Sequence, residues 1–191
     1  MKYIFVDTET GGLDESAADV LQLAWTLTDE EFRPLRTESR FLPQTLPVTE
    51  KSLELHGLTK EFLKENAEDP EEVYSAFLRD LSEADCYVGH YIPFDRTFIV
   101  ADSRRRAKPA THWGIGQRLA QIRCIDTKRD FIQLCSDWQY RHHPGPYLEE
   151  MCRFLGVRTA NLRFHRADSD VEAMLQCMRQ IKRLYSDTIP N

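Results

Sequence analysis

The sequence predicts a mixed α/β fold, in which an antiparallel meander of three strands is followed by parallel strand–helix units. Two observations lead to this prediction. Residues 2–7, 20–28 and 34–42 are apolar or alternating runs joined by short connections, and strands joined in this way pair antiparallel. Beyond residue 49, helical patterns alternate with the short apolar runs 84–89 and 122–125, which is typical of parallel strands covered by helices.

The first half of the chain has clear boundaries between its predicted elements. The Gly-Gly pair at 11–12 ends the first strand, which is apolar on both faces like a central strand. The acidic run 29–31 forms the turn between the second and third strands. Short helices are predicted at 49–55 and 59–63, and the threonine that begins the second can cap it.

The second half is predicted to be mainly helical, because its apolar residues recur at helical spacing. The predicted helices cover residues 70–81, 93–103, 127–134, 146–155 and 166–185. Residues 107–117 contain one proline and two glycines and are predicted to form a flexible loop. The length of 191 residues predicts one domain, residues 1–187, with a short tail at 188–191.

Composition and charge narrow the classes of protein. No apolar run approaches the roughly 20 residues of a membrane span, and the N-terminal run is too short for a signal peptide. We therefore expect no membrane partner and a cytoplasmic location. The net charge of −6 argues against a protein that coats nucleic acid but permits a nuclease whose carboxylates bind metal. The five widely spaced cysteines predict buried free thiols rather than a zinc site.

Two carboxylates follow the first strand directly. Asp7 and Glu9 are two positions apart, so they share one face of an extended chain. Two negative charges held side by side repel each other unless a cation lies between them. This pair therefore predicts a divalent metal site.

Two further carboxylates and one histidine are candidates for the same site. Asp95 opens a predicted helix on its apolar side, although an acid in this position can also stabilise the helix N-terminus. In the last helix, Asp170 lies at the edge of the apolar arc, whereas Asp168 lies outside it and is expected to be solvated. His165 is predicted to lie in the preceding loop, either over the site or without a function.

Together these residues predict metal-dependent phosphoryl chemistry. Strand ends and the helix starts that follow them meet at one crevice of a parallel sheet. Carboxylate oxygens suit Mg²⁺ or Mn²⁺, and two such ions roughly 4 Å apart can clamp the attacking and leaving oxygens of a phosphate. A histidine titrates near neutral pH and can accept the proton of the attacking water.

The combined motifs resemble those of the DEDDh 3′–5′ exonucleases, the DnaQ-like family of proofreading exonucleases that includes exonuclease X and RNase T. The matching segments are Asp-Thr-Glu-Thr at 7–10, His-x3-Phe-Asp at 90–95 and His-x4-Asp at 165–170. The segment His-Gly-Leu-Thr at 56–59 is similar to one near the family's nucleotide pocket. The resemblance covers residues 2–184 and implies an RNase H-like fold with a five-stranded mixed sheet flanked by helices.

The resemblance also implies a role for each motif residue. Asp7, Glu9 and Asp170 would be direct ligands of two Mg²⁺ (or Mn²⁺) ions, with Asp7 bridging them. Asp95 would help to hold the ions, and His165 would be the general base. The pocket for the 3′-terminal nucleotide would be formed by Thr10, Leu13, His56 and Phe94.

The implied activity is hydrolysis from a nucleic-acid 3′ end, in single-stranded DNA or RNA, with release of nucleoside 5′-monophosphates. DNA replication, repair and RNA turnover stay open as pathways, and a DNA polymerase or a second copy of the chain stays open as a partner. One residue departs from the family, because Tyr91 stands where an asparagine is usual. The basic run 104–106 either follows the incoming strand or is a solvated helix end.

Two alternatives remain at this level. The first is a non-catalytic RNase H-like module that binds nucleic acid or a polymerase, although every expected ligand is present. The second is a metal phosphoesterase that acts on small nucleotides, which the acidic net charge allows.

Overall fold

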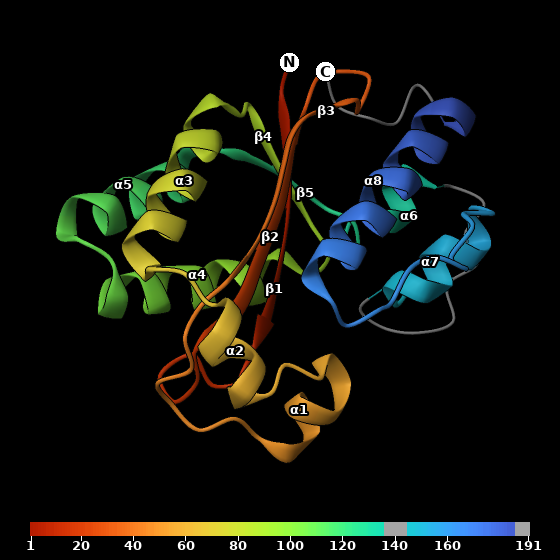
Figure 1. Cartoon of the computed structure of the whole chain (residues 1–191). Coiled ribbons are helices and arrows are strands. Elements are labelled where there is room, and N and C mark those ends of the chain that lie inside the picture. Colours follow the sequence, from red (N-terminus) through yellow and green to blue (C-terminus); the bar gives the residue numbers. More distant parts are fainter. Residues whose placement is uncertain (136–144, 186–191) are drawn as a thin grey trace.

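A five-stranded mixed sheet forms the centre of the molecule in a computed structural model that describes residues 1–135 and 145–185 (Figure 1). The strands lie in the order β3-β2-β1-β4-β5. β2 pairs antiparallel with β1 and β3, whereas β4 pairs parallel with β1 and β5. The predicted meander followed by parallel units is confirmed. The strands are β1 (Tyr3–Thr10), β2 (Val20–Thr28), β3 (Pro34–Phe41), β4 (Cys86–Gly89) and β5 (Arg123–Asp126).

Helices cover both faces of this sheet. Figure 1 shows α3, α4 and α5 on one side, α6, α7 and α8 on the other, and α1 and α2 beyond the end of β1. The helices are α1 (Glu50–His56), α2 (Lys60–Asn66), α3 (Pro70–Glu83), α4 (Ile92–Arg106), α5 (Pro109–Gln121), α6 (Phe131–Leu134), α7 (Leu148–Phe154) and α8 (Ala167–Leu184).

The central strand β1 contributes to a hydrophobic core on each face. Ile4 and Val6 pack with the side chains of α3, α4 and α5. Tyr3 and Phe5 pack with those of α7 and α8. Because side chains alternate along a strand, this arrangement defines two faces, and the residues that follow Phe5 continue the same alternation toward the end of β1.

The prediction of a flexible loop at residues 107–117 is wrong, because the structure has α5 there. Pro109 occupies the first turn, where a backbone N–H has no helical partner to lose. Gly114 is needed for packing rather than flexibility, since a Cβ on it would lie 2.7 Å from Cδ2 of Leu78 in α3. The glycine therefore allows two helices to approach closely.

The predicted helix at 127–134 is also wrong in its first half, because α6 is limited to Phe131–Leu134. The Asp126 carboxylate accepts hydrogen bonds from the backbone N–H groups of Lys128 and Arg129. Thr127 donates to the carbonyl of Gly89. These bonds give the backbone a turn in place of a helix. The predicted tail at 188–191 lies outside the described residues.

Two predictions about composition are corrected or refined. Four of the five cysteines are buried free thiols, as expected, but Cys124 is exposed. Within residues 1–135 and 145–185, no helix combines the length and apolar character needed to cross a lipid bilayer.

The basic run at the end of α4 is used inside the protein. Arg105 and Arg106 donate to the buried carboxylate of Asp102, and they also donate to the carbonyls of Ala18 and Val20. A role in following a nucleic-acid strand does not fit these two arginines, because their donors already have protein acceptors. The alternative of a simply solvated helix end does not fit them either.

Candidate active site

The end of β1 places two carboxylates on the face of the sheet that α8 covers. Asp7 and Glu9 pair in register with Ala24 and Gln22 of β2, and they continue the alternation that begins at Tyr3. Thr8 points to the other face, where its hydroxyl donates to Asp95 Oδ1 at 2.7 Å. The end of β1 therefore presents two carboxylates to the face that α8 covers, and a hydroxyl that holds Asp95 of α4 to the other face.

The first turn of α8 completes a cluster of three carboxylates. One oxygen of Asp7, one of Glu9 and one of Asp170 all lie within 4.8 Å of one another. The structure thus brings together residues from the first and last motifs of the sequence. Asp95, at the start of α4, lies beside this trio and is held by Thr8 rather than being a member of it.

Burial and mutual repulsion raise the pKa of every one of these acids. The pKa of Asp7 is raised well above its ordinary value by burial, and next by the charges of Asp95 and Asp170. Burial, with Asp170 and Asp95 nearby, raises the pKa of Glu9 to about 8. A concentration of acids with raised pKa values indicates a site that lacks compensating positive charge.

The other two carboxylates are also raised, although hydrogen bonds partly oppose the effect. Burial raises the pKa of Asp95 to about 7 against the hydrogen bond from Thr8. Burial likewise raises the pKa of Asp170 to about 7 against the hydrogen bond from the His165 backbone. The Oδ1 atom of Asp170 is buried and has no hydrogen-bond partner within the described part of the chain. A buried carboxylate oxygen without a donor is suited to a cation.

His165 lies in the loop directly before α8, at an exposed position, as the sequence predicts. Its backbone N–H donates to Asp170 Oδ2 at 3.2 Å. Its φ of 61° is in the left-handed region, which is uncommon for a residue other than glycine. A residue held in this conformation points to a functional constraint on the loop.

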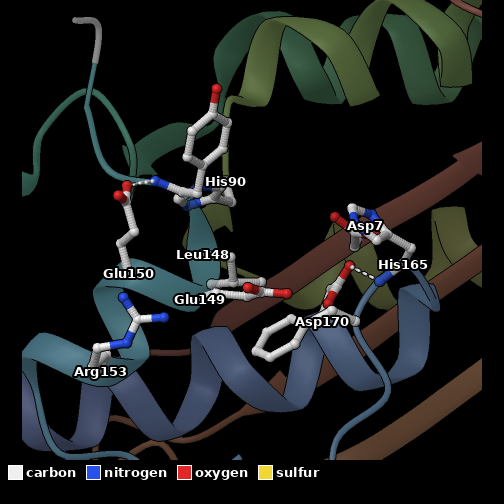
Figure 2. A pocket seen from close by; sticks show the side chains of 10 residues that line it. Asp7, His90, Leu148, Glu149, Glu150, Arg153, His165 and Asp170 are labelled. Atoms are coloured by element: carbon white, nitrogen blue, oxygen red, sulfur yellow. Dashed lines mark hydrogen bonds between the residues drawn. The ribbon is translucent and has the colours of Figure 1, made fainter. Parts of the chain in front are cut away.

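A cavity of about 590 Å³ opens onto these groups. Figure 2 shows Asp7, His165 and Asp170 close together, with Glu149 of α7 reaching toward them. The cavity is therefore formed between the end of β1, the start of α8 and the first turns of α7. Its lining residues are Asp7, His90, Tyr147, Leu148, Glu149, Glu150, Arg153, Phe164, His165 and Asp170.

The four residues predicted to bind the terminal nucleotide are placed elsewhere, and none of them lines this cavity. Leu13 is 82% exposed, whereas His56 is buried and its Nδ1 accepts from the Leu58 N–H. Burial lowers the pKa of His56, which favours the neutral imidazole. Thr10 donates to the Gly12 carbonyl, and the Phe94 ring packs against another ring of α4.

Several cavity residues were not predicted as site residues. His90 pairs through Nδ1 with Thr127 Oγ1 at 3.0 Å, and its Nε2 is buried without a hydrogen-bond partner among the described residues. Burial lowers the pKa of His90 to about 4, so this ring is neutral. His90 stands in the second motif, which was a usable signal. Glu149 lies in the first turn of α7 and Tyr147 directly before that helix, for which the sequence offered no motif.

The fold and this carboxylate cluster place the protein among the nucleases with an RNase H-like fold. The chain belongs to the exonuclease family, because residues 4–178 match the RNase T family model, which describes an exonuclease. No curated protein sequence matches the chain.

Solved structures agree with this fold. A zinc-bound complex of E. coli exonuclease I with single-stranded DNA is 19% identical with a TM-score of 0.77, over 97% of this chain and 41% of that one. The same enzyme with a dT13 oligonucleotide is 20% identical with a TM-score of 0.74, over 97% and 42%. Exonuclease I from Methylocaldum szegediense is 18% identical with a TM-score of 0.75, over 98% and 41%. The chain thus spans about two fifths of their length.

Proposed function

We propose that residues 1–187 form one exonuclease domain that hydrolyses single-stranded nucleic acid from the 3′ end and releases nucleoside 5′-monophosphates. The observation that carries this proposal is the trio of carboxylates from Asp7, Glu9 and Asp170, with oxygens within 4.8 Å of one another at the edge of a cavity. The family match and the structural neighbours that hold single-stranded DNA support it.

The donor set fits divalent cations. All the candidate ligands are carboxylates, which are hard oxygen donors suited to Mg²⁺ or Mn²⁺. Burial and mutual repulsion raise the pKa values of Asp7 and Glu9, and Oδ1 of Asp170 has no hydrogen-bond partner among the described residues, so bound cations would compensate the charge of these groups. We assign Asp7, Glu9 and Asp170 as the groups that hold two ions, with Asp95 as a supporting carboxylate. Such ions, when bound, supply positive charge for the attacking and leaving oxygens.

The protein's own groups supply proton transfer and orientation. His165 is the candidate base that accepts the proton of the attacking water, because it stands at the mouth of the cavity beside Asp170. The neutral His90 can donate to or accept from the substrate through its Nε2, which has no hydrogen-bond partner among the described residues. We assign Thr10, at the end of β1, and Leu13, His56 and Phe94 as the residues that contact the terminal nucleotide.

A digestion experiment tests this function. A short single-stranded oligonucleotide, labelled at its 5′ or its 3′ end, is incubated with the protein in Mg²⁺ or in EDTA. We expect a progressive ladder from the 5′-labelled strand and immediate release of mononucleotide from the 3′-labelled strand, both lost in EDTA. The variant Asp7→Asn should abolish both. Asp14→Asn is the matched control, because Asp14 is an exposed carboxylate in the segment that follows β1.

Other outcomes identify the alternatives. An Asp7→Asn variant that digests at the parent rate shows that the site is wrong. Tight binding without hydrolysis under all metal conditions identifies a non-catalytic binding module. Hydrolysis of dinucleotides but of no longer strand identifies a phosphoesterase for small nucleotides.

A further inference from the structure

A cluster of two tyrosines and two basic side chains lies beside the cavity, and we call it the aromatic–basic wall. It consists of Tyr91, Lys128, Arg129 and Tyr147. The Lys128 ammonium lies 4.7 Å from the centre of the Tyr147 ring and 6.0 Å from that of Tyr91. The Arg129 guanidinium lies 5.1 Å from the centre of the Tyr91 ring. The two rings are 39% and 65% exposed for Tyr91 and Tyr147, which is high for large aromatic residues.

The wall is held in place by buried contacts between three segments. The carboxylate of Asp126 accepts from the N–H groups of Tyr91 and Ile92 at the start of α4. It also accepts from the N–H groups of Lys128 and Arg129 in the loop after β5. One buried carboxylate thus fixes the loop that carries the two cations against the helix start that carries the first ring.

The second ring is fixed to the same loop by a glycine. Gly145 has a φ of 147°, and a Cβ on this residue would lie only 1.9 Å from the carbonyl oxygen of Lys128. The chain that leads to Tyr147 therefore lies directly against the Lys128 backbone, and only glycine fits there. The exposed rings and the two cations beside them therefore form a preformed surface, held in place by the backbone.

The wall is continuous with the proposed active site. Tyr147 lines the same cavity as Asp7, His165 and Asp170. His90, the residue before Tyr91, lines this cavity too (Figure 2). A strand whose end lies at the carboxylates can leave the cavity past this surface.

The two basic side chains of the wall favour an anionic partner. In residues 1–135 and 145–185, neither Lys128 nor Arg129 forms an ion pair with a carboxylate. Two acids of α7, Glu149 and Glu150, line the cavity next to Tyr147, and Glu150 accepts from the Tyr147 N–H. In a protein with a net charge of −6, two cations that lie on exposed aromatic faces, without an ion pair among the described residues, offer a local site for phosphates.

We infer that the aromatic–basic wall binds the single-stranded nucleic acid upstream of the scissile phosphate, an inference that rests on the proposed exonuclease function. Bases stack on the exposed faces of Tyr91 and Tyr147, and backbone phosphates pair with Lys128 and Arg129. Alternating aromatic and basic groups bind single strands without reading their sequence, because every base has a face to stack and every nucleotide a phosphate. The tyrosine at position 91 thus gives this chain a stacking surface at the point where its family usually has an asparagine.

Binding is measured by fluorescence anisotropy with a labelled DNA oligonucleotide in EDTA, so that cleavage does not interfere. Tyr91→Asn is the preferred variant, because φ of Tyr91 is 74° and asparagine tolerates this conformation. We expect Tyr91→Asn and Tyr147→Ala each to weaken binding by about tenfold, the effect of losing one stacked base. The double variant Lys128→Gln/Arg129→Gln should flatten the slope of log K against log salt by about 1.4, for two phosphates of a single strand.

Matched controls separate this surface from general exposure. Trp113→Ala removes a 67% exposed ring from α5, and Lys108→Gln removes an exposed cation near it. Both should bind like the parent chain. Thermal melting of each variant shows whether it is folded. Wall variants that are folded and bind like the controls overturn the inference, and RNA in place of DNA shows whether the surface distinguishes the two.

A second substrate distinguishes a failure of the proposed exonuclease function from a failure of the proposed binding surface. The p-nitrophenyl ester of thymidine 5′-monophosphate carries one nucleotide and does not reach the wall, so the loss in kcat/KM of Tyr91→Asn should be about tenfold larger on the oligonucleotide. A parent chain that cleaves neither substrate, but binds the oligonucleotide through the wall, refutes the proposed function and leaves the surface assigned. A parent chain that cleaves both, with wall variants that show equal losses on the two substrates, refutes the surface alone.

Discussion

Gln22 of β2 donates a hydrogen bond from Nε2 to Oδ1 of Asp168 in α8 at 2.9 Å, although the two residues are 146 positions apart. The Oε1 of the same amide accepts from the Ala167 N–H at 3.2 Å. Gln22 is fully buried and pairs in register with Glu9. One amide therefore links the strand position of Glu9 to the helix turn that carries Asp170. Asp168, although exposed, thus accepts a hydrogen bond that helps to hold the start of α8 against β2.

This link predicts that Gln22→Leu lowers both the free energy of unfolding and the rate of oligonucleotide digestion. The change leaves the N–H of Ala167 without its acceptor, and an unmet buried group of this kind costs about 1–3 kcal/mol. It also frees the first turn of α8, so Asp170 loses its fixed distance from Glu9. Urea unfolding and the rate of oligonucleotide digestion measure the two effects.

The control for this prediction is Ser39→Ala. Ser39 is the other acceptor of the Gln22 amide, at 3.0 Å, and it belongs to β3 rather than to α8. Its loss should cost less than about 1 kcal/mol and leave the digestion rate close to that of the parent chain. Equal effects of the two substitutions would mean that the amide does not position α8.

The raised pKa values of the carboxylates predict how stability changes with pH. Burial and mutual repulsion raise the pKa of Glu9 to about 8 and those of Asp95 and Asp170 to about 7. In the unfolded chain these groups titrate near 4. Between about pH 8 and pH 5 the folded protein therefore binds protons that the unfolded chain does not bind, and linkage makes the folded state more stable as the pH falls. The stabilising contribution is lost as the pH rises through the folded-state values.

Thermal melting in EDTA and in Mg²⁺ measures this dependence. In EDTA, Tm should fall as the pH rises from about 5 to about 8, and saturating Mg²⁺ should flatten the fall because cations replace the protons. Asp7→Asn removes one of the repelling charges and should reduce the slope in EDTA, whereas Asp14→Asn should not change it. A slope that is the same with and without Mg²⁺ would contradict a metal site at these carboxylates.

His165 is predicted to act as a base without holding metal. His165→Asn is the suitable variant, because asparagine tolerates the φ of 61° and so removes the imidazole without adding strain to the backbone. Loss of a general base lowers kcat by about 10²–10⁴-fold. The increase of Tm on addition of Mg²⁺ should remain as in the parent chain, since Asp7, Glu9 and Asp170 are intact.

Two results would change this assignment. If the Mg²⁺-dependent increase of Tm disappears with the activity, His165 is a ligand and not a base. If kcat is unchanged, another group of the cavity accepts the proton. The neutral His90 is then the first residue to test by mutation.

The sequence predicted those parts of the fold that depend on local patterns. The second strand was predicted at 20–28 and is observed at Val20–Thr28, because its apolar pattern and the acidic turn after it are adjacent in sequence. The region 107–117 could not be predicted in this way. Taken alone, Gly114 predicts a break in a helix. The structure shows that a glycine is needed there because the Leu78 side chain, from a helix distant in the sequence, packs against it.

The residues of the candidate site likewise divide into those that local sequence position predicts and those that depend on the packing of distant elements. That Asp7, Glu9, Asp170 and His165 lie near one another could be predicted, because each lies at the end of an element and strand ends of such a sheet meet in space. Tyr147 and Glu149 were missed, because the side of the cavity that α7 forms depends on the packing of α7 against α8. No spacing along the chain encodes that contact.

The last prediction concerns the basic run at the end of α4. Asp102 is completely buried and accepts from Arg106 Nε at 2.9 Å and from the Tyr74 hydroxyl at 2.5 Å. Arg106→Ala leaves this carboxylate buried without its main cation, and breaking a buried pair in this way costs about 3 kcal/mol. We therefore expect a clear loss of stability in urea, while the affinity of the folded variant for an oligonucleotide stays unchanged. Arg104→Ala, at the exposed end of the same run, should change neither quantity. An Arg106→Ala variant of parent stability that binds the oligonucleotide weakly would instead assign the run to the nucleic acid.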